Sequence, residues 1–154
     1  MFDLVADVER YPEFVPLCTG LRVRSRRASG DGRQALVADM SVGYKMIRER
    51  FTSRVSLDRP RLRVVVEYID GPFSYMENIW TFRNEPDGQR SVVTFFIDYE
   101  FRSRFLRSLM GSMFDAAFRK FAQAFEKRAD QVYGQADRAP VIASNHRLTR
   151  EDIP

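Results

Sequence analysis

Residues 103–133 read SRFLRSLMGSMFDAAFRKFAQAFEKRADQVY, and this stretch decides the fold. Its apolar residues recur every three or four positions, which predicts one long amphipathic helix that ends at Gly134. At ~1.5 Å per residue this helix is longer than any predicted strand, so we expect it to lie across a sheet. One stripe of the helix consists of Phe105, Leu109, Met113, Ala117, Phe121 and Phe125, and it is widened by Leu106, Met110, Phe114, Phe118 and Ala122.

The sequence ahead of this helix predicts an antiparallel sheet. Apolar and polar residues alternate with a period of two in about six segments, separated by turn residues such as GDG at 30–32, Gly71-Pro72 and EPDGQ at 85–89. The six segments are residues 21–27, 36–42, 46–57, 61–70, 74–82 and 92–101. A short amphipathic helix with Phe2, Leu4, Val5 and Val8 opens the chain, and Tyr11-Pro12 interrupts it. The predicted fold class is therefore α+β.

Composition is that of a globular domain. The chain has 154 residues, 44% of them hydrophobic, with thirteen Phe and a net charge of +4. No stretch reaches the ~18 uncharged apolar residues of a membrane-spanning helix, so we expect a soluble, intracellular protein. Residues 1–133 form the predicted domain, and residues 134–154 are polar and aperiodic, which predicts a flexible tail.

Residues suited to catalysis or metal binding are scarce. The single cysteine, Cys18, has no histidine nearby in sequence, and the single histidine, His146, lies in the predicted tail. These two side chains exclude an intramolecular disulfide and are too few for a structural zinc site. The two Gly-containing segments are ordinary turns rather than phosphate loops. We therefore expect Cys18 to pack in the core, and we expect no bound metal and no catalytic residue, although the residue types alone do not exclude an enzyme.

Two polar residues fall on the inward faces of predicted strands. Glu49 alternates with Ile47 and Phe51, and Asn78 alternates with Met76 and Trp80. An unpaired carboxylate among apolar residues costs several kcal/mol, so either both residues belong to a satisfied hydrogen-bond network or they face a ligand cavity. The apolar stripe of the long helix is likewise either plain core or one wall of that cavity, and its methionines suit an adaptable wall.

Arginines gather at the start of the long helix. Arg102, Arg104 and Arg107 oppose the helix dipole there. They form either a solvated charge run or a contact with an anionic surface, which is membrane phosphate or ribosomal RNA, and Arg22, Arg24 and Arg26 would enlarge the contact.

Three segments together resemble one known family. LVADVERYPEFVPLC at 4–18, VGYKMIRERFTSRV at 42–55 and DGPFSYMENIWTF at 70–82 are similar to the signature segments of the coenzyme Q-binding family, whose bacterial members include RatA-type ribosome association toxins and polyketide cyclase/dehydrase-like proteins. The resemblance covers residues 1–133 and implies the helix-grip fold of START-like domains, a curved sheet wrapped on the long helix. Members usually begin with a strand before the first helix. That strand is missing here, so we expect an unpaired sheet edge or a true start upstream.

The resemblance implies non-catalytic binding of a hydrophobic lipid, ubiquinone (coenzyme Q), in a tunnel between sheet and helix, in support of respiratory electron transport. The quinone is then a bound ligand, with no required cofactor and no DNA partner. The cavity wall predicted from the resemblance and from the inward faces comprises Tyr11, Phe14, Met40, Glu49, Phe51, Phe73, Asn78, Trp80, Phe95, Tyr99, Met110, Met113, Phe114 and Ala117. The resemblance also places Pro12, Pro16 and Pro72 in the lid and turn segments.

The alternative function is a RatA-type regulator that binds a ribosomal subunit through its arginines and blocks subunit association. A polyketide cyclase-like enzyme is the third hypothesis. The expected location is the bacterial cytoplasm, with peripheral contact at the inner membrane.

Overall fold

A computed structural model describes residues 1–86, 91–134 and 141–144. Six antiparallel strands follow two short helices and precede one long helix, as the sequence predicts. The elements are α1 (Phe2–Ala6), the 3₁₀ helix η1 (Val8–Glu13), β1 (Cys18–Ala28), β2 (Arg33–Tyr44), β3 (Ile47–Asp58), β4 (Arg63–Asp70), β5 (Phe73–Asn84), β6 (Ser91–Phe101), α2 (Arg104–Tyr133) and β7 (Val141–Ser144). The predicted hairpin turn at 85–89 lies mostly outside the described residues.

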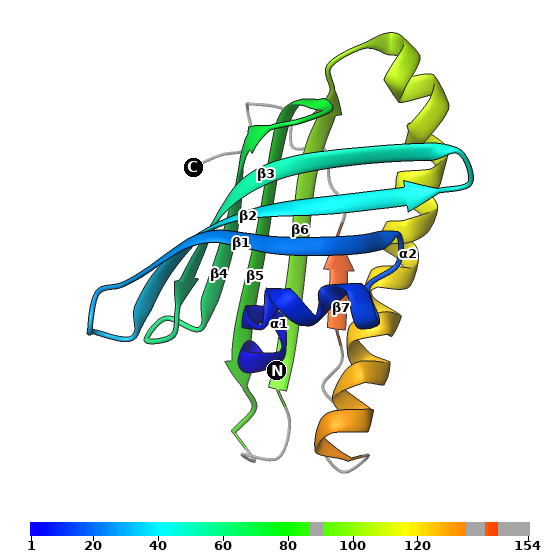
Figure 1. Ribbon diagram of the computed structural model, residues 1–154. Coiled ribbons are helices and arrows are strands. Elements are labelled where there is room, and N and C mark those ends of the chain that lie inside the picture. The colour runs from blue at the N-terminus through cyan, green and yellow to red at the C-terminus, as the bar shows by residue number, and fades with distance from the viewer. Residues whose placement is uncertain (87–90, 135–140, 145–154) are drawn as a thin grey trace, which may run out of the picture.

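The sheet is a meander in which each strand pairs with the next along the chain, in the order β1 to β7. Strands β1–β3 sweep across β4–β6 at a steep angle, so the sheet is strongly curved and α2 lies along its open side (Figure 1). The predicted helix-grip architecture is confirmed. Curvature of this kind leaves a concave face that one helix must fill with side chains.

The C-terminal strand β7 differs from the prediction. Residues 141–144 fall in the predicted flexible tail, yet they pair in parallel with β6, Val93 opposite Val141 through Phe96 opposite Ser144. An aperiodic four-residue segment gives too short a pattern for sequence reading to detect a strand. This part of β6 is therefore paired, whereas β1 pairs only with β2 among the described strands, so the expected unpaired edge lies at β1. The other residues of the predicted tail beyond Gly134 lie outside the described ranges.

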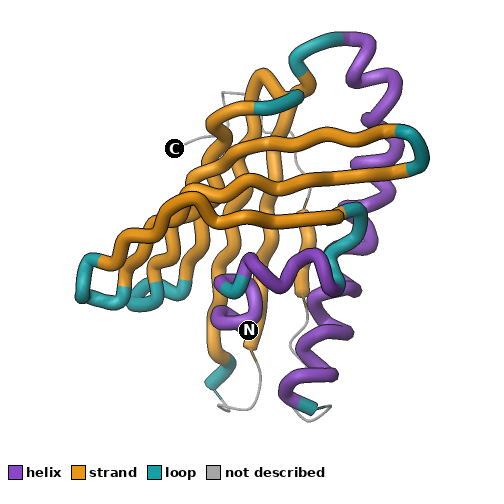
Figure 2. Tube along the Cα trace, viewed as in Figure 1, coloured by secondary structure: helices purple, strands orange, loops and turns teal. Residues whose placement is uncertain are grey.

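Helix α2 begins and ends with the expected caps. The Ser103 hydroxyl accepts a hydrogen bond from the Leu106 amide at 3.1 Å, and Gly134 adopts a positive φ of 83° at the other end. The predicted stripe is buried only in part, because the first turn of α2 extends past the sheet (Figure 2). Phe105 and Leu109 are 72% and 46% exposed, so their prediction as core is wrong.

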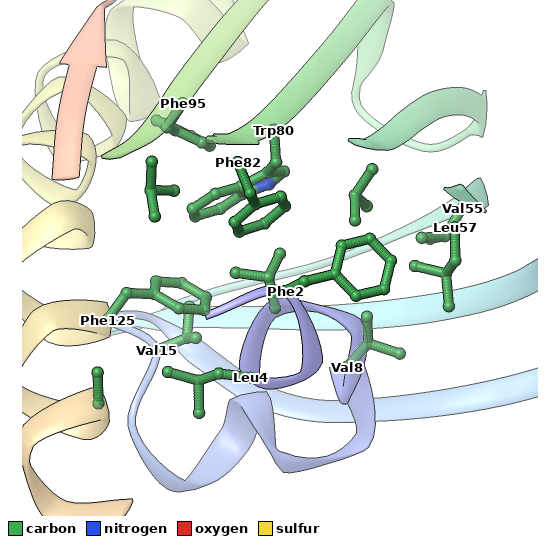
Figure 3. Packing of buried hydrophobic residues seen from close by; sticks show 14 of the residues in the cluster. Phe2, Leu4, Val8, Val15, Val55, Leu57, Trp80, Phe82, Phe95 and Phe125 are labelled. Atoms are coloured by element: carbon green, nitrogen blue, oxygen red, sulfur yellow. The ribbon is translucent and has the colours of Figure 1, made fainter. Parts of the chain in front are cut away.

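The N-terminal helices close one end of the concave face. Phe2, Leu4, Val5 and Val8 are all buried, as their helical spacing predicts. Figure 3 shows Phe2, Leu4 and Val8 beneath the strand residues of one large hydrophobic cluster, which also contains Val5, Trp80, Phe95 and Phe125 and which we call the Phe125 cluster.

A second, smaller core lies near the start of α2, and we call it the Met110 cluster. Its buried members are Val42, Phe73, Met76, Phe101, Met110 and Phe114. Gly71 permits the tight turn beside it, because its φ is 141° and a Cβ there would lie 2.6 Å from Phe51 Cβ. The two clusters secure α2 to the sheet at separate places.

Candidate functional site

A cavity of about 110 Å³ lies between α2 and the concave face of the sheet. Helix α2 contributes Phe114, Ala117, Phe118 and Phe121 to its wall. The fully buried Met110 and Phe125 flank this stretch and are not part of the wall. Because Ala117 is the smallest of these side chains, the helix leaves room at the middle of the wall. The cavity is thus bounded at each end by one of the two hydrophobic clusters.

The sheet and the N-terminal segment supply the rest of the wall, which is almost entirely apolar. The lining residues outside α2 are Val8, Tyr11, Pro16, Leu17, Leu21, Ala38, Met40, Val42, Phe51, Ser53, Val55, Val64, Val66, Phe73, Met76, Asn78, Trp80, Phe95 and Ile97. The described lining contains no Asp, Glu, His, Lys or Arg side chain. Such a wall suits an uncharged, largely apolar molecule.

Nine of the fourteen predicted wall residues line the cavity. They are Tyr11, Met40, Phe51, Phe73, Asn78, Trp80, Phe95, Phe114 and Ala117. This placement describes the wall of the cavity, and ligand contact by these residues stays a prediction.

The other five predicted wall residues lie elsewhere. Glu49 is half-buried close to the β2–β3 hairpin, where its carboxylate keeps contact with solvent. Met110 fills the core of its cluster, and Met113 packs partly buried against that cluster. Tyr99 packs on Phe118 and donates its hydroxyl to Asp115 at 3.0 Å.

Phe14 is the fifth of these residues. Its ring contacts Tyr11 and Phe125 edge-on, with ring centroids 5.9 and 5.0 Å away. Phe14 therefore packs behind Tyr11, outside the cavity. Of these two residues, only Tyr11 lines the cavity.

The polar side chains of the predicted wall residues Asn78 and Tyr11 make hydrogen bonds to other groups of the protein. Asn78 donates its amide to the Phe96 carbonyl at 2.7 Å and accepts a hydrogen bond from the Trp80 indole at 2.9 Å. The Tyr11 hydroxyl donates to the Val5 carbonyl at 2.6 Å, and desolvation raises its pKa, so it stays neutral. For Asn78, the satisfied-network interpretation is thus correct, although the residue also lines the cavity.

Cys18 packs in the Phe125 cluster, as predicted. Burial raises the pKa of its thiol to about 11, so the sulfur is protonated at neutral pH. Within the described ranges, no three His, Cys, Asp or Glu side chains are grouped as metal ligands would be.

Residues 1–126 match the family described as polyketide cyclase / dehydrase and lipid transport. The chain belongs to this family. Members of the polyketide cyclase / dehydrase and lipid transport family that resemble it include the ribosome association toxin RatA of Rickettsia prowazekii, 33% identical over 135 residues, which cover 86% of this chain and 88% of the relative. The mitochondrial coenzyme Q-binding protein COQ10 homolog B of Xenopus laevis is 31% identical over 153 residues, which cover 97% of this chain and 60% of the relative.

Solved structures of similar proteins have the same fold. The 18 kDa protein CC1736 of Caulobacter crescentus superimposes with a TM-score of 0.67 and 34% identity, over 86% of this chain and 88% of that one. The Zhui aromatase/cyclase of a Streptomyces species gives a TM-score of 0.63 at 15% identity, over 88% of each chain, which shows the shared fold alone. These matches confirm the predicted family and the START-like helix-grip fold.

Arginines dominate the outer, convex face of β1 and β3 in this family member. Arg48, Arg50 and Arg54 alternate on β3 with inward-facing residues, and Arg22 and Arg24 belong to β1. All five are exposed, and we call them the basic face. Of the predicted helix arginines, Arg107 pairs with Glu100 at 3.0 Å and Arg102 lies 3.9 Å from Asp70, and in the basic face Arg24 is likewise paired, with Asp39 at 2.7 Å. Arg104 is exposed.

One buried carboxylate organises the basic face, and the sequence reading does not identify it. Asp39 is 6% exposed and accepts hydrogen bonds from Thr52 at 2.6 Å and from Arg24 at 2.7 Å. The Thr52 hydroxyl first, and Arg24 after it, hold the pKa of Asp39 below its ordinary value. Asp39 thus ties β1, β2 and β3 together beneath the arginines.

We expect Asp39→Asn to lower the free energy of unfolding at pH 7 by about 1–2 kcal/mol, since charge-assisted hydrogen bonds are lost. The native pKa is lowered, so the carboxylate stabilises the fold above the ordinary Asp pKa of about 4, and this contribution disappears as pH falls through the native value. Urea unfolding of both proteins from pH 7 to pH 2 measures the difference, which should shrink towards zero in acid.

The matched control is Asp7→Asn, which breaks an exposed ion pair with Arg10. It should change stability by less than about 0.5 kcal/mol. A difference for Asp39→Asn that persists at pH 2 would contradict the role of the charge.

Proposed function

We propose that this protein binds a hydrophobic lipid between α2 and the sheet, and that the lipid is an isoprenoid quinone such as ubiquinone. The apolar cavity with its uncharged wall is the observation that carries the proposal. The likeness to a protein named as coenzyme Q-binding supports the choice of ligand. The role that follows is holding or delivering a quinone for respiratory electron transport, without a reaction on it.

The size of the cavity sets a condition on this proposal. Ligand sites for drug-sized molecules hold roughly 300–1,000 Å³, and this cavity holds about 110 Å³. A quinone therefore requires the wall to move outward. The sheet strands are hydrogen-bonded to one another, whereas Phe114, Phe118 and Phe121 contribute side chains to the wall. We therefore expect helix α2, rather than the sheet, to move outward when a quinone binds.

Peripheral contact with a membrane fits the same role, since a lipid must enter from a bilayer. Phe105 and Leu109 are exposed on the first turns of α2, close in sequence to Arg104 and Arg107. Apolar side chains beside cations bind the interface of anionic membranes. None of the described helices is long and apolar enough to cross a bilayer.

The basic face favours a second candidate, association with a ribosomal subunit. Several relatives are named ribosome association toxins. Five exposed arginines on β1 and β3, the strands on either side of β2, suit the phosphate backbone of RNA. We propose the basic face, rather than the start of α2, as the surface for that partner.

Ala117→Phe tests the quinone proposal. The added ring occupies the cavity, so we expect protein from a quinone-producing host to lose co-purified quinone, and a short-chain quinone analogue to bind about tenfold or more weakly. Mass spectrometry of solvent extracts and fluorescence titration measure the two effects. Ala116→Phe, on the exposed side of the same turn, is the control and should behave as wild type. Wild-type protein that neither carries nor takes up quinone would refute this ligand.

For the membrane contact, Phe105→Ala should weaken co-sedimentation with vesicles rich in phosphatidylserine by roughly five- to tenfold, because the ring loses its apolar burial. Tyr133→Ala removes a 44% exposed ring at the other end of α2 and should have no effect. Equal losses in the two variants, or equal binding to uncharged vesicles, would exclude this surface.

Sedimentation with purified ribosomal subunits tests the second candidate. Arg50→Glu combined with Arg54→Glu should abolish binding, and binding of the wild type should weaken steeply with salt as counterions are released. Arg119→Glu combined with Lys120→Glu makes the same charge change on exposed positions of α2 and serves as the control. Quinone uptake should be insensitive to all four changes. If both double variants lose subunit binding alike, the basic face has no special role.

A further inference from the structure

Two residues that carry hydroxyl groups lie opposite each other on the concave face of the sheet. The strand register places Ser53 of β3 directly opposite Tyr68 of β4. Both face the helix, since Phe51 and Val55 on one strand and Val66 on the other line the cavity. Directly opposed residues of an antiparallel pair have Cβ atoms about 4.5–5.5 Å apart. Ser53 thus lines the cavity, and Tyr68 is its neighbour on the next strand, directly behind the wall.

The two hydroxyls differ in their surroundings: that of Ser53 belongs to a side chain on the cavity wall, and that of Tyr68 is buried behind it. Ser53 is 5% exposed, lines the cavity and has no side-chain hydrogen bond to any described residue. The phenol oxygen of Tyr68 is buried and has no hydrogen-bond partner among the described residues. A buried hydroxyl without a partner is costly. A ligand oxygen that accepts from this pair would remove that cost.

The remaining polar groups of the wall are already engaged. Asn78 uses its amide and its carbonyl oxygen on Phe96 and Trp80, and Tyr11 donates to Val5. Ser53 and Tyr68 thus stand out as the groups able to recognise the polar part of a ligand.

The local backbone holds Tyr68 at the Met110 end of the cavity. The register of β3 and β4 shifts between Thr52 and Ser53, so Ile69 is the extra residue of a β-bulge. The Tyr68 ring packs edge-on against Phe73, with centroids 5.7 Å apart, and Phe73 lines the cavity. Tyr68 is itself one step behind the wall, next to the Met110 cluster.

We propose that Ser53 and Tyr68 form the head-group subsite of this cavity and donate hydrogen bonds to a carbonyl oxygen of the ligand. The rest of the ligand then extends along the apolar wall towards Phe121. A carbonyl oxygen accepts two such bonds, one from each hydroxyl. The described lining offers no cation, so a neutral ketone, quinone or ester is selected over the carboxylate of a fatty acid. This inference rests on the lipid-binding function proposed above.

The test compares decylbenzoquinone with decylbenzene, which has a planar six-carbon ring and the same tail but no carbonyl. We expect Tyr68→Phe and Ser53→Ala each to weaken quinone binding about three- to tenfold, since each removes one hydrogen bond. Their affinity for decylbenzene should be unchanged. Tyr75→Phe is the matched control, because the Tyr75 hydroxyl bonds Glu77 on the outer face and is 44% exposed.

Protein stability separates this role from a structural one. Tyr68→Phe removes an unpartnered hydroxyl, so the thermal midpoint of the free protein should stay the same or rise. Wild-type binding of both probes with no selective loss in either variant would overturn the subsite and leave lipid binding intact. Equal losses for both probes would show that Tyr68 only shapes the wall. Failure of the wild type to bind either probe would overturn both proposals.

Discussion

The ring of Phe125 holds the three layers of this molecule together. It is fully buried, and its centroid lies 4.9 Å from that of Trp80 on the sheet and 5.4 Å from that of Tyr11 in the N-terminal segment. Aromatic contacts of this kind add about 0.5–1.5 kcal/mol each beyond burial. Met110 makes the corresponding attachment near the start of α2. The cavity lies between these two attachments, where side chains of α2 line it opposite the curved sheet.

The chain's own periodicity was enough to predict the six strands and the long helix, and the resemblance to a known family supplied their helix-grip arrangement. Alternation marked six strands, and the 3.6-residue stripe marked α2. The same stripe could not separate Met110, which fills the core, from Ala117, which borders empty space, because both share one helix face. Glu49 failed as a wall residue for a related reason. Alternation gives the face of a residue but not how far along the strand the cavity extends.

The features that sequence could not reveal depend on strand register. Ser53 meets Tyr68, and Asp39 meets Thr52, across neighbouring strands, and a bulge decides the first of these pairs. A shift of one residue would send each side chain to the opposite face. The short strand β7 also depends on a partner distant in sequence. Long-range pairing, rather than local propensity, determines these contacts.

Ligand binding in the cavity, as proposed above, would also link the lifetime of the protein to the supply of that ligand. Native interiors are close-packed, so a void lined by Ala117, Phe118 and Trp80 leaves those side chains without some of the contacts of a full core. A ligand present at about 100 times its Kd adds about 2.7 kcal/mol to the free energy of unfolding. Quality control in cells removes unfolded chains continuously. Filled molecules would then outlast empty ones, and the amount of protein would follow the amount of ligand.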